Sequence, residues 1–187
     1  MSSLVSEEVQ SISPVVNTVV AANTVDLMLF VQHERCWARG KLGLEPDAHY
    51  VIRTSTDATR PHERKWLIDS ALEIVRQRMF HVELLVAPVI GHDHMPCPFT
   101  AADVSLTCPI YEDWPICVEE PLTYNRPFVA TDISDLTPME ASDIVCKVVT
   151  AEPVEIAKAL MRTLELGGAT DGRKHVRRLS LDEERES

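Results

Sequence analysis

The 187-residue sequence is poor in glycine and in basic residues, and both shortages exclude classes of function. It contains only six glycines, and neither a GxGxxG nor a GxxxxGK[ST] phosphate loop occurs. Those loops need glycine because their backbone must approach phosphate closely, so a conventional dinucleotide or nucleoside-triphosphate site is disfavoured. The 18 Lys and Arg residues against 29 Asp and Glu give a formal charge of −11, which disfavours nucleic acid and anionic lipid as partners.

Long apolar runs and closely paired cysteines are missing as well. No apolar run approaches the ~20 residues that cross a bilayer, and residues 1–10 lack the basic and apolar regions of a signal peptide. The five cysteines show no CxxC spacing, and their odd number indicates reduced thiols rather than a disulfide framework. We therefore expect a cytoplasmic protein without a membrane span.

The apolar segments that are present predict an α/β fold in one domain. Hydrophobic residues make up 45% and charged residues 25% of the chain, as in ordinary globular proteins. Strands are expected over residues 15–22, 50–53, 82–87, 104–107, 128–131 and 144–149. Helices are expected over residues 34–42, 62–80, 153–166 and 175–186. Because strands alternate with helices, we expect a single Rossmann-like domain, in which helices flank a parallel sheet.

Local signals add detail to three of these elements. The run 82–87 is apolar at nearly every position, which is typical of a strand buried on both faces. Gly43 and Gly167 are expected to end the first and the third helix, since glycine readily adopts the left-handed conformation. Pro153 is expected in the first turn of the third helix, where its missing N–H costs nothing.

A pair of glutamates, Glu112 and Glu120, lies where a parallel sheet places its ligands, after a strand and around a helix start. Pro115 marks the expected helix start, so Glu112 falls in the entering loop and Glu120 about a turn and a half inside the helix. Both carboxylates could then face the hydroxyls of a sugar or ribose, while the first-turn amides face a phosphate. On spacing alone, the pattern favours solvated carboxylates on a helix face.

A metal site is an alternative interpretation of one further cluster. It comprises His92, Asp93, His94, Cys97 and Cys108. These are residue types that bind zinc, but their spacing matches no standard arrangement. The pattern favours a polar loop after a strand, and we expect no bound metal.

A thiol nucleophile is the second alternative, with Cys117 as the candidate. This cysteine lies in an apolar stretch near the expected helix start. Its surroundings favour a small buried hydrophobic side chain over a reactive thiol.

Several segments, taken together and in order, resemble the C-terminal domain of a known enzyme family. They are residues 99–107 (FTAADVSLT), 111–115 (YEDWP), 120–122 (EPL) and 125–132 (NRPFVATD). The sequence around them is similar to the donor-binding domain of the retaining, nucleotide-sugar-dependent glycosyltransferases of family four (glycosyl transferases group 1), which have the GT-B fold.

Further segments extend this resemblance over roughly residues 15–184. They are an interdomain-like segment at 23–30, a helix and turn at 39–48, a basic pair with the spacing Arg60-x4-Lys65, and closing helices at 157–181. The resemblance implies a loose tail over 1–15 and an interdomain-like segment with a short helix over 16–48. Residues 49–187 would then form the nucleotide-sugar-binding Rossmann-like domain, which is half of a GT-B fold.

The resemblance also implies roles for individual residues around a nucleotide-diphospho-sugar. Arg60 and Lys65 would hold the diphosphate, with Arg64 as the alternative to Lys65. Glu120 would accept hydrogen bonds from the ribose hydroxyls, and Glu112, the catalytic candidate, would face the transferred sugar.

The remaining implied contacts come mainly from the backbone. The amides around Trp114, Pro115 and Ile116 would lie near the phosphates, and the base would lie near residues 86–89. Members of the family need no metal, and no other cofactor is implied.

The sequence departs from the family pattern at four positions. Asp113 and Thr24 stand where the family usually has glycine, and Trp114 replaces a small residue. Pro121 falls inside the expected helix, where it removes a hydrogen bond and crowds the preceding turn. Asp113 and Trp114 are expected to weaken donor binding.

Length is the largest departure, because a two-domain GT-B enzyme needs about twice this chain. We expect the acceptor-binding domain to be absent, so that the chain supplies one wall of the active-site cleft and is inactive alone. The implied partners are a separate acceptor-binding domain or a second copy of the chain. The alternative is a non-catalytic remnant, or a binding module with the same fold.

Overall fold

A computed structural model describes residues 33–54, 64–87, 96–110, 116–132, 146–167, 170–174 and 176–177. Its strands are β1 (His49–Thr54), β2 (Val82–Ala87), β3 (Val104–Thr107), β4 (Phe128–Thr131) and β5 (Cys146–Val149). Its longer helices are α2 (Arg35–Leu42), α3 (Lys65–Arg76), α4 (Pro96–Ala101), α5 (Ile116–Thr123) and α7 (Pro153–Leu166). Among the described residues, none of the helices has the length and apolar character needed to cross a bilayer.

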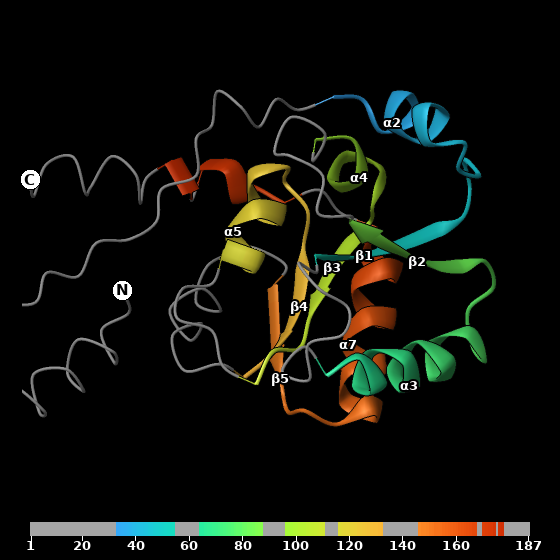
Figure 1. The fold of residues 1–187 in the computed structure, drawn as a ribbon, viewed down its shortest axis with the longest axis vertical. Coiled ribbons are helices and arrows are strands. Elements are labelled where there is room, and N and C mark those ends of the chain that lie inside the picture. The colour runs from blue at the N-terminus through green and yellow to red at the C-terminus, as the bar shows by residue number, and fades with distance from the viewer. Residues whose placement is uncertain are drawn as a thin grey trace, which may run out of the picture.

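All five strands form one parallel sheet in the order β2-β1-β3-β4-β5 (Figure 1). The chain first moves outward from β1 to β2 and then crosses back, so β3 lies on the other side of β1. The strand order therefore reverses between β1 and β3. In open parallel sheets, ligands bind at the carboxyl ends of the strands beside such a reversal.

Helices cover both faces of the sheet, as the alternation of strands and helices predicts. On one face, α3 and α7 pack over Val51, Leu106 and Val129 in the larger hydrophobic cluster (Figure 1). Ile52 points to the opposite face, where it packs with Phe99 and Tyr124. Those two rings stack with centroids 5.3 Å apart. Since neighbouring residues of β1 enter different clusters, the centre of the sheet is buried from both sides.

Strand β2 differs from its prediction. We expect a strand buried on both faces, but among the described strands β2 lies at the edge of the sheet and pairs with β1 alone. Val86, near its end, keeps 49% of its surface exposed. An apolar run shows that a strand packs against something, but its place in the strand order depends on contacts between distant segments.

Most other boundaries agree with the sequence. Gly43 and Gly167 end α2 and α7 with φ of 66° and 61°, both in the left-handed region that glycine favours. The helix expected over 62–80 is shorter, running from Lys65 to Arg76, and residues 61–63 lie outside the described part. The strand expected over 15–22 also lies outside it, as does most of the helix expected over 175–186.

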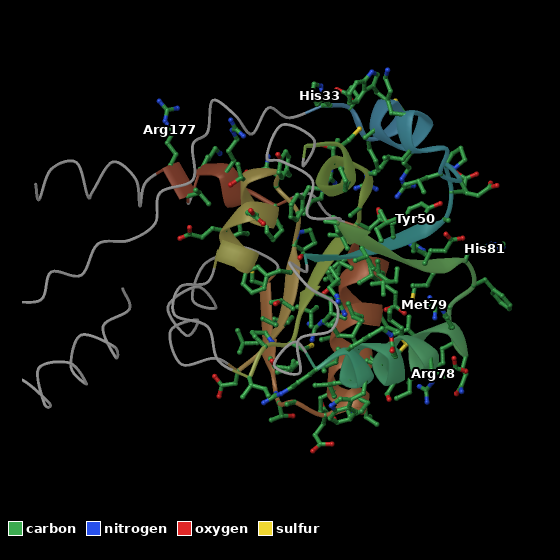
Figure 2. The ribbon with its side chains drawn as sticks, in the orientation of Figure 1. His33, Tyr50, Arg78, Met79, His81 and Arg177 are labelled. Atoms are coloured by element: carbon green, nitrogen blue, oxygen red, sulfur yellow. The ribbon has the colours of Figure 1, made fainter. Side chains whose placement is uncertain are left out.

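The Asp103 carboxylate joins three elements at the amino-terminal end of the sheet. It accepts hydrogen bonds from Arg35 Nη1 at 2.8 Å, from Arg39 Nη2 at 2.9 Å and from the backbone N–H of Tyr50 at 2.8 Å. Arg39 also donates from Nε to the Ala101 carbonyl at 3.1 Å. Figure 2 shows Tyr50 at the end of the sheet that lies nearest α2. These contacts fix α2 and the last residue of α4 against the starts of β1 and β3.

Candidate functional site

The reversal between β1 and β3 defines the candidate site, at the carboxyl ends of these two strands. The described residues there are the end of β1, the segment after β3 up to Ile110, and the start of α5, a helix that carries Glu120 and runs back toward the start of β4. Arg53 is the cation nearest the end of β1, and Lys65 begins the helix that follows it. The opposite end of the sheet carries the Asp103 contacts, so the two regions are separated by the length of the strands.

Four of the residues expected in the site lie outside the described residues: Arg60, Glu112, Trp114 and Pro115. Ile116 is described as the first residue of α5, but only its backbone is placed. Asp113 and the segment His92 to His94 of the metal interpretation also lie outside the described part. The roles assigned to all of these residues stay predictions.

Lys65 is the first residue of α3, at the correct end of the sheet for a phosphate ligand. Its ammonium group forms an ion pair with Asp69 one helical turn on, and both side chains are largely exposed. Arg64, the alternative, precedes the helix with φ of 44°, in the left-handed region. To bind a diphosphate, the Lys65 ammonium group must therefore break its ion pair with Asp69 and contact the phosphate instead.

Glu120 lies in α5, and the structure buries it, leaving 8% of its surface exposed. Burial raises the pKa of its carboxyl from an ordinary value of 4.5 to about 7. The neighbouring Glu119 is buried as well. The interpretation of Glu120 as a solvated carboxylate on a helix face is therefore wrong. A carboxyl that titrates near neutral pH beside a strand reversal has the character of a functional group.

Tyr124 is a titratable residue that feels the charge of this carboxyl, and Arg173 in turn acts on Tyr124. The pKa of Tyr124 is raised, mainly by burial and next by the Glu120 charge, while Arg173 acts in the opposite direction. Arg173 is positioned by two hydrogen bonds, from its backbone N–H to Asn125 Oδ1 at 2.9 Å and from its Nη1 to the Thr123 carbonyl at 3.1 Å. The segment after α7 thus brings a cation to the end of α5 (Figure 1).

Gly172 permits this close approach. A Cβ atom at this position would lie 2.7 Å from the Leu122 carbonyl oxygen, which is closer than side chains tolerate. The backbone N–H of Thr170 adds a hydrogen bond to the Asn125 carbonyl at 2.9 Å. The fold of residues 170–174 therefore completes the enclosure of the second half of α5.

Pro121 lies inside α5, as the sequence predicts. It cannot donate a backbone hydrogen bond, but its carbonyl accepts from the N–H groups of Tyr124 at 3.0 Å and Arg126 at 2.9 Å. Asn125 then adopts φ of 54°, which ends the helix and turns the chain into β4. The proline thus stands directly after Glu120, where a ladder hydrogen bond of the helix is missing.

Arg53 is a candidate ligand that the sequence pattern did not single out. This residue is buried near the carboxyl end of β1 and pairs in register with Val86 of β2. Strand alternation places it on the same face as Val51, the face that α3 covers. The sequence did contain an indication of this site, because Arg53 is a basic residue in a largely apolar strand and lies next to the carboxyl end, where ligands are expected. Buried cations at such an edge suit a diphosphate better than exposed ones, because water screens them less.

Neither alternative chemistry gains support from the described residues. Cys146 is buried, and burial raises the pKa of its thiol to about 12. Burial also raises the pKa of Cys97, although Lys41 acts in the opposite direction. Within the described residues, no cluster of His, Cys, Asp and Glu could hold a metal ion. The side chain of Cys117 lies outside that part.

Comparisons with known proteins identify the fold. No protein-family model and no curated protein sequence matches the chain. Among solved structures, it is similar to a sucrose-phosphate synthase of Thermosynechococcus elongatus, with a TM-score of 0.73 and 18% identity over 96% of this chain and 53% of that one. It is also similar to HepE of Anabaena in complex with UDP and glucose, with a TM-score of 0.64 and 14% identity over 82% of this chain and 50% of that one.

A third comparison places this similarity within the larger fold. The chain matches the C-terminal domain of a glycosyl transferase group 1 family protein (LpcC) of Francisella tularensis, with a TM-score of 0.67 and 13% identity. This match covers 80% of the present chain and 95% of that domain, whereas the present chain spans about half the length of the synthase and of HepE. The chain therefore has the fold of the C-terminal half of a GT-B glycosyltransferase.

Proposed function

We propose that this chain is the donor-binding half of a glycosyltransferase and binds a nucleotide-diphospho-sugar at the carboxyl ends of β1 and β3. The observation that carries this proposal is the position of Glu120. A buried carboxyl lies on the helix that follows β3, beside the reversal of strand order, in a fold shared with HepE, which was solved with UDP and glucose. A structural carboxyl would be expected on the solvated face of such a helix.

Glu120 is the proposed partner of the ribose hydroxyls. An ionised carboxylate can accept two hydrogen bonds from neighbouring hydroxyls, and such bonds are stronger than those between neutral groups. Since burial raises the pKa of Glu120 to about 7, part of the free protein carries a proton there at neutral pH. Donor binding through the ionised form then releases this proton.

Positive charge is proposed to stabilise the diphosphate leaving group. As the bond between the sugar and the diphosphate breaks, negative charge builds up on the leaving oxygen, and nearby cations lower the energy of that state. Arg60 and Lys65 keep this proposed role, and Arg53 joins them because it is buried at the same edge. Glu112 is proposed to face the sugar, and the backbone around Trp114, Pro115 and Ile116 to face the phosphates.

The acceptor must be held by protein outside this half of the fold. Trp66, Ile110 and Val154 follow the ends of β1, β3 and β5, and each exposes at least half of its side chain. They supply apolar surface at the edge where the second half of a GT-B fold would close the cleft. Exposed apolar groups are not confined to this edge, since Phe80 lies at the other end of the sheet.

The first prediction concerns donor binding by the purified chain. A UDP, GDP or ADP sugar should raise the melting temperature at millimolar concentration, because a ligand that binds the native state stabilises it. Glu120→Ala should weaken the same donor about tenfold in calorimetry, through loss of hydrogen bonds to a charged group. Glu165→Ala, an exposed carboxylate on α7, serves as the control and should bind normally. Failure of all three donor classes would refute the proposed site.

The second prediction concerns the pH dependence of stability. Glu120 is harder to ionise when folded than when unfolded, so wild-type stability is lost as pH rises from the unfolded pKa of 4.5 to the folded pKa of about 7. Glu120→Gln removes this loss. Its free energy of unfolding relative to wild type should rise by about 2 to 3 kcal/mol between about pH 5 and about pH 8.

Urea denaturation at both pH values measures this difference. Glu165→Gln provides the matched control, because its carboxylate is exposed on α7. A pH-independent difference between Glu120→Gln and wild type would show that Glu120 ionises freely and is not enclosed as described.

The third prediction is that the isolated chain does not transfer sugar. Much of the rate of such a reaction comes from holding donor and acceptor together and from excluding water, and half a cleft does neither. A radiolabelled nucleotide sugar with mixed acceptors should give no product above the buffer control. Turnover that Glu112→Ala abolishes would instead show that the chain is a complete enzyme.

A further inference from the structure

Two arginines contact a single aspartate at the amino-terminal end of the sheet, opposite the proposed donor site, and a third arginine feels its charge. Arg35 and Arg39 contact the two oxygens of Asp103, and Arg126, just before β4, lies close enough to feel all three charges. The cluster therefore carries three positive charges and one negative charge. Within the described part of the chain, Asp103 is the one acid that offsets the charge on Arg126.

Arg39 uses three of its five N–H groups to join elements of the protein. Its Nε donates to the Ala101 carbonyl, its Nη1 to the Pro46 carbonyl and its Nη2 to Asp103. Its guanidinium also lies over the ring of Tyr50, 5.0 Å from the centroid. All three of its nitrogen atoms are tied to protein acceptors, so Arg39 is mainly a structural residue, and Arg35 and Arg126 are the arginines of the cluster with more donors to spare.

Arg126 is more than nine-tenths buried and yet only partly bonded. Its Nη2 donates to the Thr100 carbonyl at 3.1 Å, but its Nε has no hydrogen-bond partner among the described residues. The hydroxyl of Thr100 is also buried without a partner in that part of the structure. A buried donor without a partner is costly, and two such donors on residues that share a hydrogen bond point to a missing polar group.

Arg35 is the partly exposed arginine of this cluster. Its side chain is 38% exposed, and its one hydrogen bond in the described part is from Nη1 to Asp103 at 2.8 Å. Burial lowers the pKa of Arg126 to about 10, with Arg35 and Arg39 acting in the same direction and Asp103 against them. The charges of these two arginines, both of which have spare donors, therefore repel each other, and an anion would relieve this repulsion.

We propose that Arg35 and Arg126 form a binding site for a dianionic phosphate group, either inorganic phosphate or a phosphate monoester. The excess of two positive charges matches a phosphate that carries close to two negative charges at neutral pH. Guanidinium groups bind phosphate oxygens with paired hydrogen bonds, and Arg126 Nε and the Thr100 hydroxyl supply donors on the buried side. The site lies at the opposite end of the strands from the nucleotide-sugar site and does not depend on it.

Titration of the full chain with inorganic phosphate tests this proposal. Calorimetry and thermal shift, at constant ionic strength set with chloride, should show saturable binding and a rise in melting temperature. Arg35→Gln should weaken phosphate about tenfold or more, because it removes charge-assisted hydrogen bonds. Circular dichroism would verify that this variant, altered at a partly exposed position, keeps the wild-type fold.

Two control variants locate the bound phosphate. Lys65→Gln changes the donor edge, and Arg162→Gln removes an exposed charge from α7, so both should leave the affinity unchanged. Arg126→Lys keeps one positive charge but loses the Nε donor, and it should also weaken binding. The absence of saturable binding would overturn the proposal. A loss of affinity in Lys65→Gln rather than in Arg35→Gln would do so as well, because it would place the phosphate in the donor site.

Discussion

The Asp103 carboxylate is the contact on which the centre of the sheet depends. It binds the backbone N–H of Tyr50 in β1, and the N–H of Asp103 donates in return to the Tyr50 carbonyl at 2.8 Å. Arg39 adds the Ala101 and Pro46 carbonyls to the same network. The loss of one partner from a buried ion pair typically costs about 3 to 5 kcal/mol, because the other charge is left uncompensated. Strands β1 and β3 therefore start in a fixed relation to each other.

This fixed relation sets the geometry of the other end of the sheet. Strand β1 pairs with β3 in parallel, with Val51 opposite Val104 and Ile52 opposite Ser105, so the carboxyl ends of both strands lie at the same edge of the sheet. Helix α5 leaves β3 and returns to β4, and residues 170–174 enclose its second half. Glu120 is consequently buried at the reversal of strand order, where its pKa rises to about 7.

Local sequence signals were sufficient for most of the fold. Strands β3 and β4 and helix α7 have the predicted limits, because each is a short apolar or periodic segment bounded by residues such as Asp103, Pro127 and Gly167. The edge position of β2 could not be predicted, since strand order depends on long-range pairing. The burial of Glu120 and Arg53 was missed for the same reason. The packing of distant segments determines whether a charged side chain is buried, and the local sequence around a buried charge looks the same as around an exposed one.

The candidate site could be inferred in part, through the resemblance rather than the spacing. Two glutamates eight positions apart carry little information, whereas the ordered motifs around them led to the GT-B fold that the structural comparisons show. Lys65 lies at the expected edge but pairs with Asp69, which no local pattern revealed. The roles of Arg60 and Glu112 stay predictions, because they fall outside the described residues.

The most direct test of the central claim is to map the amides that respond to UDP in a proton–nitrogen correlation spectrum of the labelled chain. The account predicts that the largest shifts fall at the carboxyl ends of β1 and β3 and in α5, including Arg53, Thr107 and Glu120. Residues at the opposite end, such as Tyr50 and Asp103, should shift little. Shifts concentrated at that opposite end, or no shifts at all at millimolar UDP, would contradict the claim that this half of the fold binds a nucleotide-sugar donor.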